Sequence, residues 1–145
     1  MPVVRARDVR RHVTPNAVMT TLASPAQGRA ELALWRVEMT AGQRGPEHTF
    51  DVEQTWTVVS GGTEIELDGE THALSAGDTI VLPAGAFRRV TAGGDGVEAL
   101  VACRAGARAR VVTAPTGARR RGSRERRGAR ASPGGGRRRP VTLRR

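Results

Sequence analysis

Four side chains that could carry out or frame chemistry lie in two short, glycine-flanked segments of the chain. They are His48, Phe50 and Gln54 within residues 42–61, and Arg88 within residues 77–92. A histidine ring can act as a general acid or base near neutral pH. An arginine can grip a carboxylate, a phosphate or an enolate-like oxygen through paired hydrogen bonds. We therefore predict His48 and Arg88 as the catalytic residues of a small-molecule pocket, with Arg88 as the clamp on an oxyanion or carboxylate.

Strand alternation decides which side chains share a face with these two. His48 and Phe50 are two residues apart, as are Gln54 and Trp56, so each pair lies on one face of its strand. We predict that both faces point into the pocket, where Phe50 and Trp56 supply apolar walls and Gln54 a neutral hydrogen-bonding group. His72 is predicted to face inward by the parity of its own strand. These four residues are the expected ligand contacts.

The segments that must position these residues are typical of short strands separated by turns. Asp68-Gly69 is a strong signal for a two-residue hairpin, because both central residues of such a turn need a positive φ. Gly61-Gly62 and residues 93–96 are interpreted as further turns, and no segment has a sustained helical apolar period. The predicted strands are 17–22, 30–39, 54–59, 63–67, 71–74, 79–82, 87–91 and 97–103. This pattern predicts an all-β barrel or jelly roll.

Composition narrows the class of protein. A chain of 145 residues is long enough for one domain with its own core. No stretch approaches the ~20 apolar residues that cross a bilayer, and the first residues lack the apolar region of a secretory signal. Cys103 is the only cysteine, which excludes an intrachain disulfide and is typical of a reducing compartment. We expect a cytoplasmic protein that does not bind membranes.

Charge divides the chain unevenly. Residues 1–103 carry a net charge of −4, whereas residues 104–145 carry 15 arginines and one acid, Glu125, and thus a net charge of +14. We predict an N-terminal arm at 1–15, a β-barrel domain at 16–112 and a disordered basic tail at 113–145. Such a tail can bind nucleic acid through phosphate contacts. All basic residues of the chain are arginines, however, and a GC-rich or shifted reading frame would also produce this composition.

Several motifs together resemble the small single-domain cupins, the RmlC-like conserved β-barrel proteins, over about residues 14–112. The resemblance is carried by residues 48–61, Asp68-Gly69-Glu70, Ala76-Gly77-Asp78 and Leu82-Pro83-Ala84-Gly85. The chain is most similar to actinobacterial cupin-domain proteins of unassigned function. The resemblance implies a cupin-type jelly-roll, or double-stranded β-helix, barrel with a pocket in its mouth. It also implies a homodimer, with activities that range from dioxygenases to isomerases, cyclases and storage proteins.

The resemblance also implies where a metal would sit. The two cupin motifs supply His, His, Glu and His to one divalent metal, and the corresponding positions here hold His48, Phe50, Gln54 and Arg88. Phenylalanine offers no ligand atom, and arginine is a permanent cation that repels a metal ion. We therefore predict a degenerate metal site and no cofactor. If a divalent metal did bind, its ligands would be His48 and Gln54.

Three functions stay open on the sequence alone. The leading one is a small organic, anionic or polyoxygenated ligand bound in the barrel, with metal-independent isomerase- or cyclase-like chemistry. The second is a metal-dependent, dioxygenase-like cupin that uses His48 and Gln54, with His72 or Glu53 completing the ligand set. The third is a non-enzymatic binding protein whose tail contacts nucleic acid. Arg88 has a structural alternative too, an ion pair with Asp51 or Glu53 that closes the barrel mouth.

Overall fold

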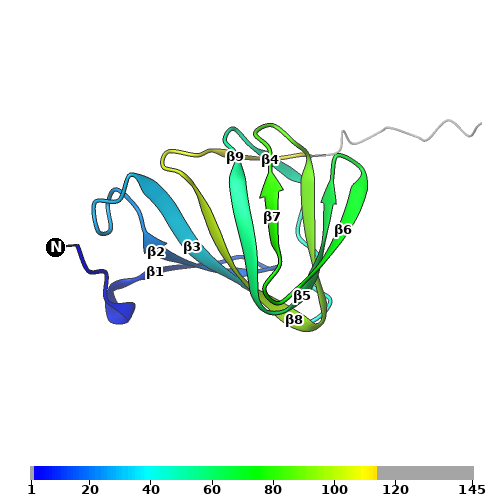
Figure 1. Ribbon diagram of the computed structural model, residues 1–145, viewed down its shortest axis with the longest axis horizontal. Helices are drawn as coiled ribbons and strands as arrows, with labels where there is room; N and C mark the ends of the chain where they lie inside the picture. The colour runs from blue at the N-terminus through cyan, green and yellow to red at the C-terminus, as the bar shows by residue number, and fades with distance from the viewer. Residues whose placement is uncertain (1, 114–145) are drawn as a thin grey trace, which may run out of the picture. The chain divides into compact units, whose positions relative to one another are not determined.

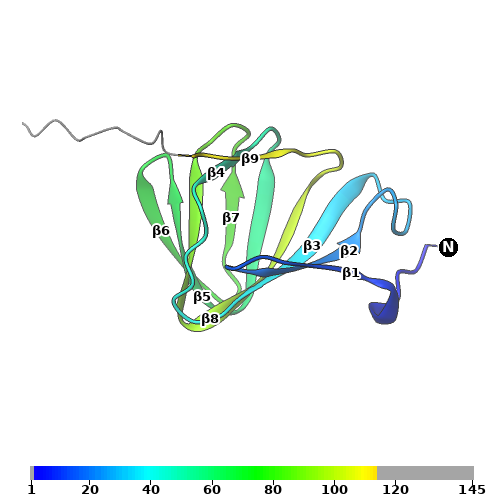
Figure 2. The same ribbon diagram turned by 180° about the vertical axis from the view of Figure 1, so that it is seen from behind.

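The computed structural model describes residues 2–113 of the chain, and these form a curled β-sheet that closes into a barrel (Figures 1 and 2). One short 3-10 turn, η1 (Ala6–Asp8), precedes the strands. The strands are β1 (Arg10–Val13), β2 (Val18–Ala23), β3 (Leu32–Met39), β4 (His48–Phe50), β5 (Gln54–Leu67), β6 (Glu70–Ser75), β7 (Thr79–Leu82), β8 (Arg88–Arg104) and β9 (Ala109–Val111). The predicted all-β class is confirmed. Within residues 2–113, no helical segment has the length and apolar character needed to cross a membrane.

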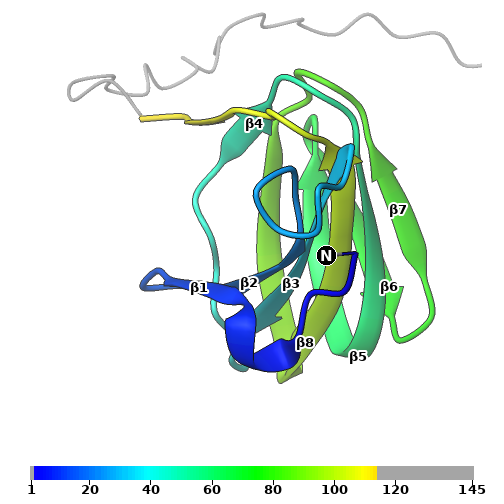
Figure 3. The same ribbon diagram turned by 90° about the vertical axis from the view of Figure 1, so that its left-hand side faces the viewer.

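Two long strands, β5 and β8, organise the barrel. They pair antiparallel with each other along most of their length, and the second half of β8 also pairs with β3. The sheet runs in the order β1-β2-β3-β8-β4-β9, while β6 and β7 pair with β5. Figure 3 looks at the barrel from the side on which β1 and β2 lie. Because β4 pairs with the start of β8 through His48 and Arg88, the first and second sequence motifs meet at one place in the sheet.

Two of the predicted turns are wrong, because the glycines bend continuous strands instead of ending them. Gly61-Gly62 lies inside β5, and residues 93–96 lie inside β8. A Cβ atom at Gly61, where φ is 72°, would stand 2.1 Å from the carbonyl oxygen of Gly96, so only glycine permits this close crossing of the two backbones. The register of β5 on β8 shifts on either side of that point, as expected where a barrel strand bends sharply.

The hairpin predicted at Asp68-Gly69 is confirmed. Both residues have positive φ angles, 47° and 87°, and Leu67 pairs with Glu70 across the turn. The hairpin joins β5 to β6. The core lies inside the curled sheet, where inward-facing residues of β3, β5, β6, β7 and β8 meet. Its buried members are Val37, Met39, Trp56, Val58, Ile65, Leu74, Leu82, Val90, Ala92, Val97, Ala99 and Val101.

The N-terminal segment is not wholly separate from the sheet. Residues 10–13, inside the predicted arm at 1–15, form β1 and pair with β2. Residues 1–113 group as one compact unit. The predicted disordered tail at 113–145 lies, apart from Thr113, outside the residues that the structure describes.

Candidate functional site

The cluster predicted from the sequence assembles where β4, β5 and β8 meet. His48 and Arg88 are paired residues of β4 and β8, and the ring of His48 meets the ring of Phe50 edge-on with centroids 5.6 Å apart. The guanidinium carbon of Arg88 lies 5.6 Å from the centroid of the Phe50 ring. Gln54 completes the cluster, since its Oε1 accepts a hydrogen bond of 2.9 Å from Nη1 of Arg88. Four residues from two separate sequence motifs thus contact one another.

A cavity of about 370 Å³ opens beside this cluster, inside the barrel. Its lining includes His48 and Phe50 from β4, Trp35 from β3 and Trp56 from β5. The full lining is Thr14, Pro15, Asn16, Ala17, Met19, Trp35, Val37, Met39, Gly45, Pro46, His48, Phe50, Trp56, Val90, Ala109 and Val111. None of these residues carries a permanent charge, and most are apolar. We refer to this space as the barrel cavity.

Aromatic side chains are concentrated on the cavity wall. The whole chain has two tryptophans, two phenylalanines and no tyrosine, and Trp35, Phe50 and Trp56 all line the barrel cavity. Trp35 and Phe50 lie close to parallel, with centroids 6.5 Å apart and 30° between their planes. Only Phe87, which is half exposed, lies away from the cavity. Trp56 also carries an indole N–H that is buried and has no partner among the described residues.

The backbone fixes the tautomer of His48. Its Nδ1 lies 3.0 Å from the carbonyl oxygen of Pro46. Because a carbonyl only accepts hydrogen bonds, Nδ1 carries the proton and Nε2 keeps its lone pair. Burial lowers the pKa of His48, the Pro46 hydrogen bond partly offsets this by raising it, and the positive charge of Arg88 lowers it further. His48 is therefore a neutral ring at physiological pH, and its acceptor nitrogen has no hydrogen-bond partner among the described residues.

This environment predicts a pH-dependent stability. Since burial holds the folded-state pKa of His48 below its ordinary value of 6.5, the unfolded chain binds more protons than the folded chain at pH values between the two pKa values. The free energy of unfolding should therefore fall as the pH drops below 6.5. Urea unfolding of the full chain and of His48→Gln at several pH values tests this, because the variant lacks the titrating ring. His72→Gln is the control, and an equal pH slope in His48→Gln and the unaltered chain would contradict the prediction.

Arg88 differs from its predicted role as a ligand clamp. Only 1 % of its surface is exposed, and it is not part of the cavity lining. Besides Gln54, its donors reach the carbonyl oxygens of Pro83 at 2.8 Å and of Ala86 at 3.3 Å. Burial lowers the pKa of Arg88, and the negative charge of Asp68 raises it. The guanidinium is thus committed to protein acceptors and does not point a free fork at a ligand.

The structural alternative for Arg88 also takes a different form from the one predicted. Among residues 2–113, Arg88 forms no ion pair with Asp51 or Glu53. Asp51 instead accepts a hydrogen bond of 2.7 Å from the backbone N–H of Arg108. The buried guanidinium donates to neutral oxygens of Pro83, Ala86 and Gln54. Arg88 thereby connects the loop after β7 to the start of β5.

Gln54 and His72 lie outside the barrel cavity. Gln54 is 1 % exposed, and its amide nitrogen has no hydrogen-bond partner among the described residues. The side chain of His72 is 39 % exposed, and its Nε2 lies 3.9 Å from a carboxylate oxygen of Glu70. Of the residues predicted for the site, His48, Phe50 and Trp56 line the cavity, whereas Gln54, Arg88 and His72 do not.

Parts of the cavity wall lie beyond the predicted site residues. The β1–β2 turn, residues 14–17, closes one side, and Ala109 and Val111 of β9 close another. The turn is built by Thr14, whose hydroxyl donates to the carbonyl of Ala17 and accepts from its N–H. Nothing in the sequence of this turn indicates that it covers a cavity whose other lining residues lie far from it in the sequence.

The cluster does not fit a metal ion. Among residues 2–113, no three histidine, cysteine, aspartate or glutamate side chains group as a metal-binding set would. More directly, Oε1 of Gln54, the neutral oxygen that could serve as a ligand, already accepts from the Arg88 cation at 2.9 Å. His48 alone is a good ligand there, and transition-metal sites use three or four. Glu53 is exposed and lines a different depression.

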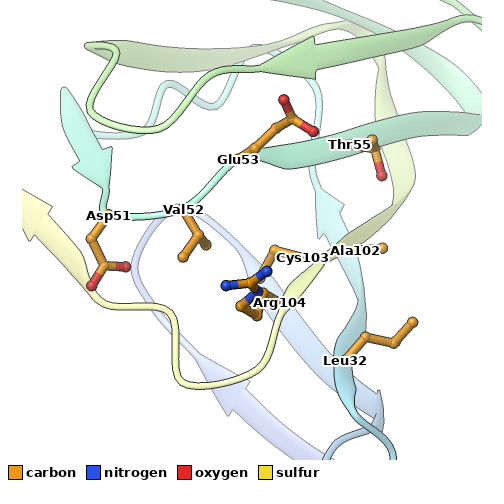
Figure 4. A pocket seen from close by; sticks show the side chains of 8 residues that line it. All are labelled: Leu32, Asp51, Val52, Glu53, Thr55, Ala102, Cys103 and Arg104. Carbon is orange, nitrogen blue, oxygen red and sulfur yellow. The ribbon is translucent and has the colours of Figure 1, made fainter.

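That second depression, of about 610 Å³, lies at the end of the barrel where β5 begins and β8 ends (Figure 4). Its lining includes Asp51, Glu53, Cys103 and Arg104. In Figure 4 the two carboxylates lie apart and do not converge on one point. Burial raises the pKa of the Cys103 thiol. The side chain of Gln54 lowers this pKa in part, and the negative charge of Asp51 raises it further. The thiol is therefore protonated and unreactive, so this depression offers no organised chemistry.

Comparison with known proteins agrees with the fold. Residues 35–103 match the family model described as Cupin domain. Residues 35–103 are therefore a cupin domain, and the fold of the described residues is the cupin jelly-roll barrel. A search of the curated proteins found no match.

Solved structures place the barrel among proteins of different activities. The polyketide cyclase RemF from Streptomyces resistomycificus superimposes with a TM-score of 0.68 at 20% identity, covering 80% of this chain and 88% of that one. An RmlC-like cupin from Shewanella frigidimarina gives 0.61 at 17% identity, covering 70% and 88%. Oxalate decarboxylase from Bacillus subtilis, at pH 4.6, gives 0.62 at 15% identity, and the match covers 69% of this chain but only 28% of that larger enzyme. At these identities the likeness shows the fold alone.

Proposed function

We propose that this protein binds a small organic molecule in the barrel cavity and that it does so without a metal ion. The observation that carries the proposal is the lining of the cavity, where three aromatic rings and several aliphatic side chains surround one acid–base group, His48. A concave apolar pocket with few polar groups is the usual form of a small-molecule site, and ~300–1,000 Å³ is the usual size. The cavity, at about 370 Å³, lies at the lower end of that range.

The chemistry that this site can supply is proton transfer by His48. Its Nε2 is unprotonated and belongs to a cavity-lining side chain, so it can accept a proton from a bound molecule as a general base and return it as a general acid. Isomerisation and cyclisation can proceed through such proton transfers without a metal ion. The structural neighbours include a polyketide cyclase, and its likeness supports the proposal only at the level of the fold.

Two further predictions from the sequence belong to the proposal without a structural observation of their own. A homodimer and a cytoplasmic location are proposed from the sequence alone. Nucleic-acid binding by the basic tail rests on composition, because the residues that would carry it lie almost entirely outside those described. The metal-dependent alternative is not proposed, since the donor set around His48 and Gln54 does not fit a metal ion.

Ligand binding in the cavity can be measured with 1-anilinonaphthalene, a neutral probe whose emission rises in apolar surroundings. We expect the full chain to bind one probe per protomer, with energy transfer from Trp35 and Trp56, because both line the cavity. Ala17→Phe places bulk in the cavity wall and should abolish the signal. Val81→Phe adds bulk at a half-exposed strand position outside the cavity and should leave the signal intact. Equal binding by both variants would show that the probe lies elsewhere and would remove the proposal.

A further inference from the structure

The barrel cavity lacks the groups that an anionic ligand needs. Its lining contains no arginine, lysine, aspartate or glutamate. The nearest cation in the cluster, Arg88, is 1 % exposed, and its donors reach Gln54, Pro83 and Ala86. A carboxylate or phosphate would lose its water on entering and find no ionic partner, which is strongly unfavourable. The lining therefore favours a neutral ligand over the anionic one expected from the sequence.

The shape of the wall favours flat rings. Trp35 and Phe50 present nearly parallel faces, with 30° between their planes, and Trp56 adds a third ring. Aromatic molecules gain from stacked and edge-on contacts beyond the area that they bury. A chain with four aromatic residues that places three of them around one cavity has a wall suited to a fused-ring ligand.

The ring of His48 offers the ligand one hydrogen bond of fixed direction. Nε2 of His48 can only accept, because the Pro46 carbonyl holds the proton on Nδ1. The hydroxyl of Thr14 is already bonded within its own turn. The indole N–H of Trp56, unpaired among the described residues, is a donor, but it makes no hydrogen bond to the histidine. A ligand that forms a hydrogen bond with His48 therefore brings a donor of its own.

We propose that the ligand of this site is a neutral, fused-ring aromatic molecule whose phenolic or enolic hydroxyl donates a hydrogen bond to Nε2 of His48. This inference rests on the proposed function, which it narrows to one class of ligand. The rings pack against Trp35, Phe50 and Trp56. The hydroxyl meets the acceptor that the backbone of Pro46 holds in place. Arg88 takes no part in the recognition of the ligand.

Three probes of the same ring size test this with the unaltered full chain by titration calorimetry. 1-Naphthol carries a hydroxyl, 1-methoxynaphthalene has the same oxygen without a proton to donate, and 1-naphthoate carries a negative charge. We expect 1-naphthol to bind about tenfold more tightly than 1-methoxynaphthalene, the usual effect of one hydrogen bond of about 1.4 kcal/mol. We expect 1-naphthoate to bind more weakly than either.

His48→Ala should remove the preference for the hydroxyl while leaving the binding of 1-methoxynaphthalene in place. The comparison among probes needs no variant, so it stands even if His48→Ala fails to fold. Equal binding of 1-naphthol and 1-methoxynaphthalene would overturn the ligand class and leave the proposed function intact. Tightest binding of 1-naphthoate would also overturn the ligand class. A preference for the hydroxyl that persists in folded His48→Ala would do the same. Failure of all three probes to bind would overturn the proposed function itself.

Discussion

Arg88→Met should destabilise the protein by about 3–5 kcal/mol, a large share of the ~5–15 kcal/mol that a domain of this kind has in total. The substitution keeps the apolar stem but removes the donors that reach Gln54, Pro83 and Ala86. Each buried acceptor left without a donor costs about 1–3 kcal/mol. The loss of the unfavourable burial of a cation offsets part of this. The midpoint of urea unfolding of the full chain measures the result.

The neighbouring residue provides a matched control. Arg89 follows Arg88 on the same strand but forms a surface ion pair, with Nη1 lying 3.7 Å from a carboxylate oxygen of Glu66. Partly exposed pairs of this kind contribute at most about 1 kcal/mol. We therefore expect Arg89→Met to shift the urea midpoint only slightly. Equal shifts of the urea midpoint for the two variants would mean that the hydrogen bonds of the buried guanidinium stabilise the fold no more than a surface ion pair does.

The triple variant Phe50→His, Gln54→Glu and Arg88→His should gain a metal site that the unaltered chain lacks. It introduces three ligand side chains beside His48, at positions whose native side chains already contact one another. The Phe50 ring lies 5.6 Å from both the His48 ring and the Arg88 guanidinium carbon, and Arg88 bonds to Gln54. Four nitrogen and oxygen ligands are enough for a transition-metal ion. We expect near-stoichiometric zinc or nickel after dialysis, measured by inductively coupled plasma mass spectrometry.

Two controls separate the effect of the ligands from that of the cation. Phe50→His together with Gln54→Glu leaves Arg88 in place, and its permanent positive charge should keep metal occupancy low. Arg88→His alone removes the cation but adds only one ligand to His48. If the triple variant folds, as judged by circular dichroism, and still binds no metal, then the four side chains do not share the geometry that their contacts indicate.

The fold is largely predictable because its signals are local. Asp68-Gly69 fixes a hairpin through its own backbone preferences, and the apolar alternation of residues 54–59 places Trp56 and Val58 on the buried face, as observed. The turns predicted at the other glycine clusters are wrong, because adjacent glycines are found both in turns and at sharp bends within continuous strands. Gly61 permits a close backbone crossing with Gly96 inside two continuous strands, and a crossing between residues so far apart leaves no mark in the local sequence.

The candidate site is only partly predictable for a related reason. Strand parity correctly places His48 and Phe50 together, since that depends on neighbours in sequence. Whether Arg88 faces a ligand or folds back onto carbonyls depends on the loop after β7, which brings the oxygens of Pro83 and Ala86 within reach. The charge-free lining of the cavity likewise depends on several distant segments of the chain, the β1–β2 turn among them. Residue types at motif positions do not contain that information.

The most direct test of a metal-free ligand site is the metal content of the unaltered full chain, purified without an affinity tag or chelators. The protein would be incubated with excess zinc, nickel, iron and manganese, dialysed, and analysed by inductively coupled plasma mass spectrometry. We predict occupancy far below one ion per protomer, with no difference between the unaltered chain and His48→Ala. One ion per protomer that disappears in His48→Ala would contradict the account, because His48 would then be a metal ligand and not the free acceptor of the barrel cavity.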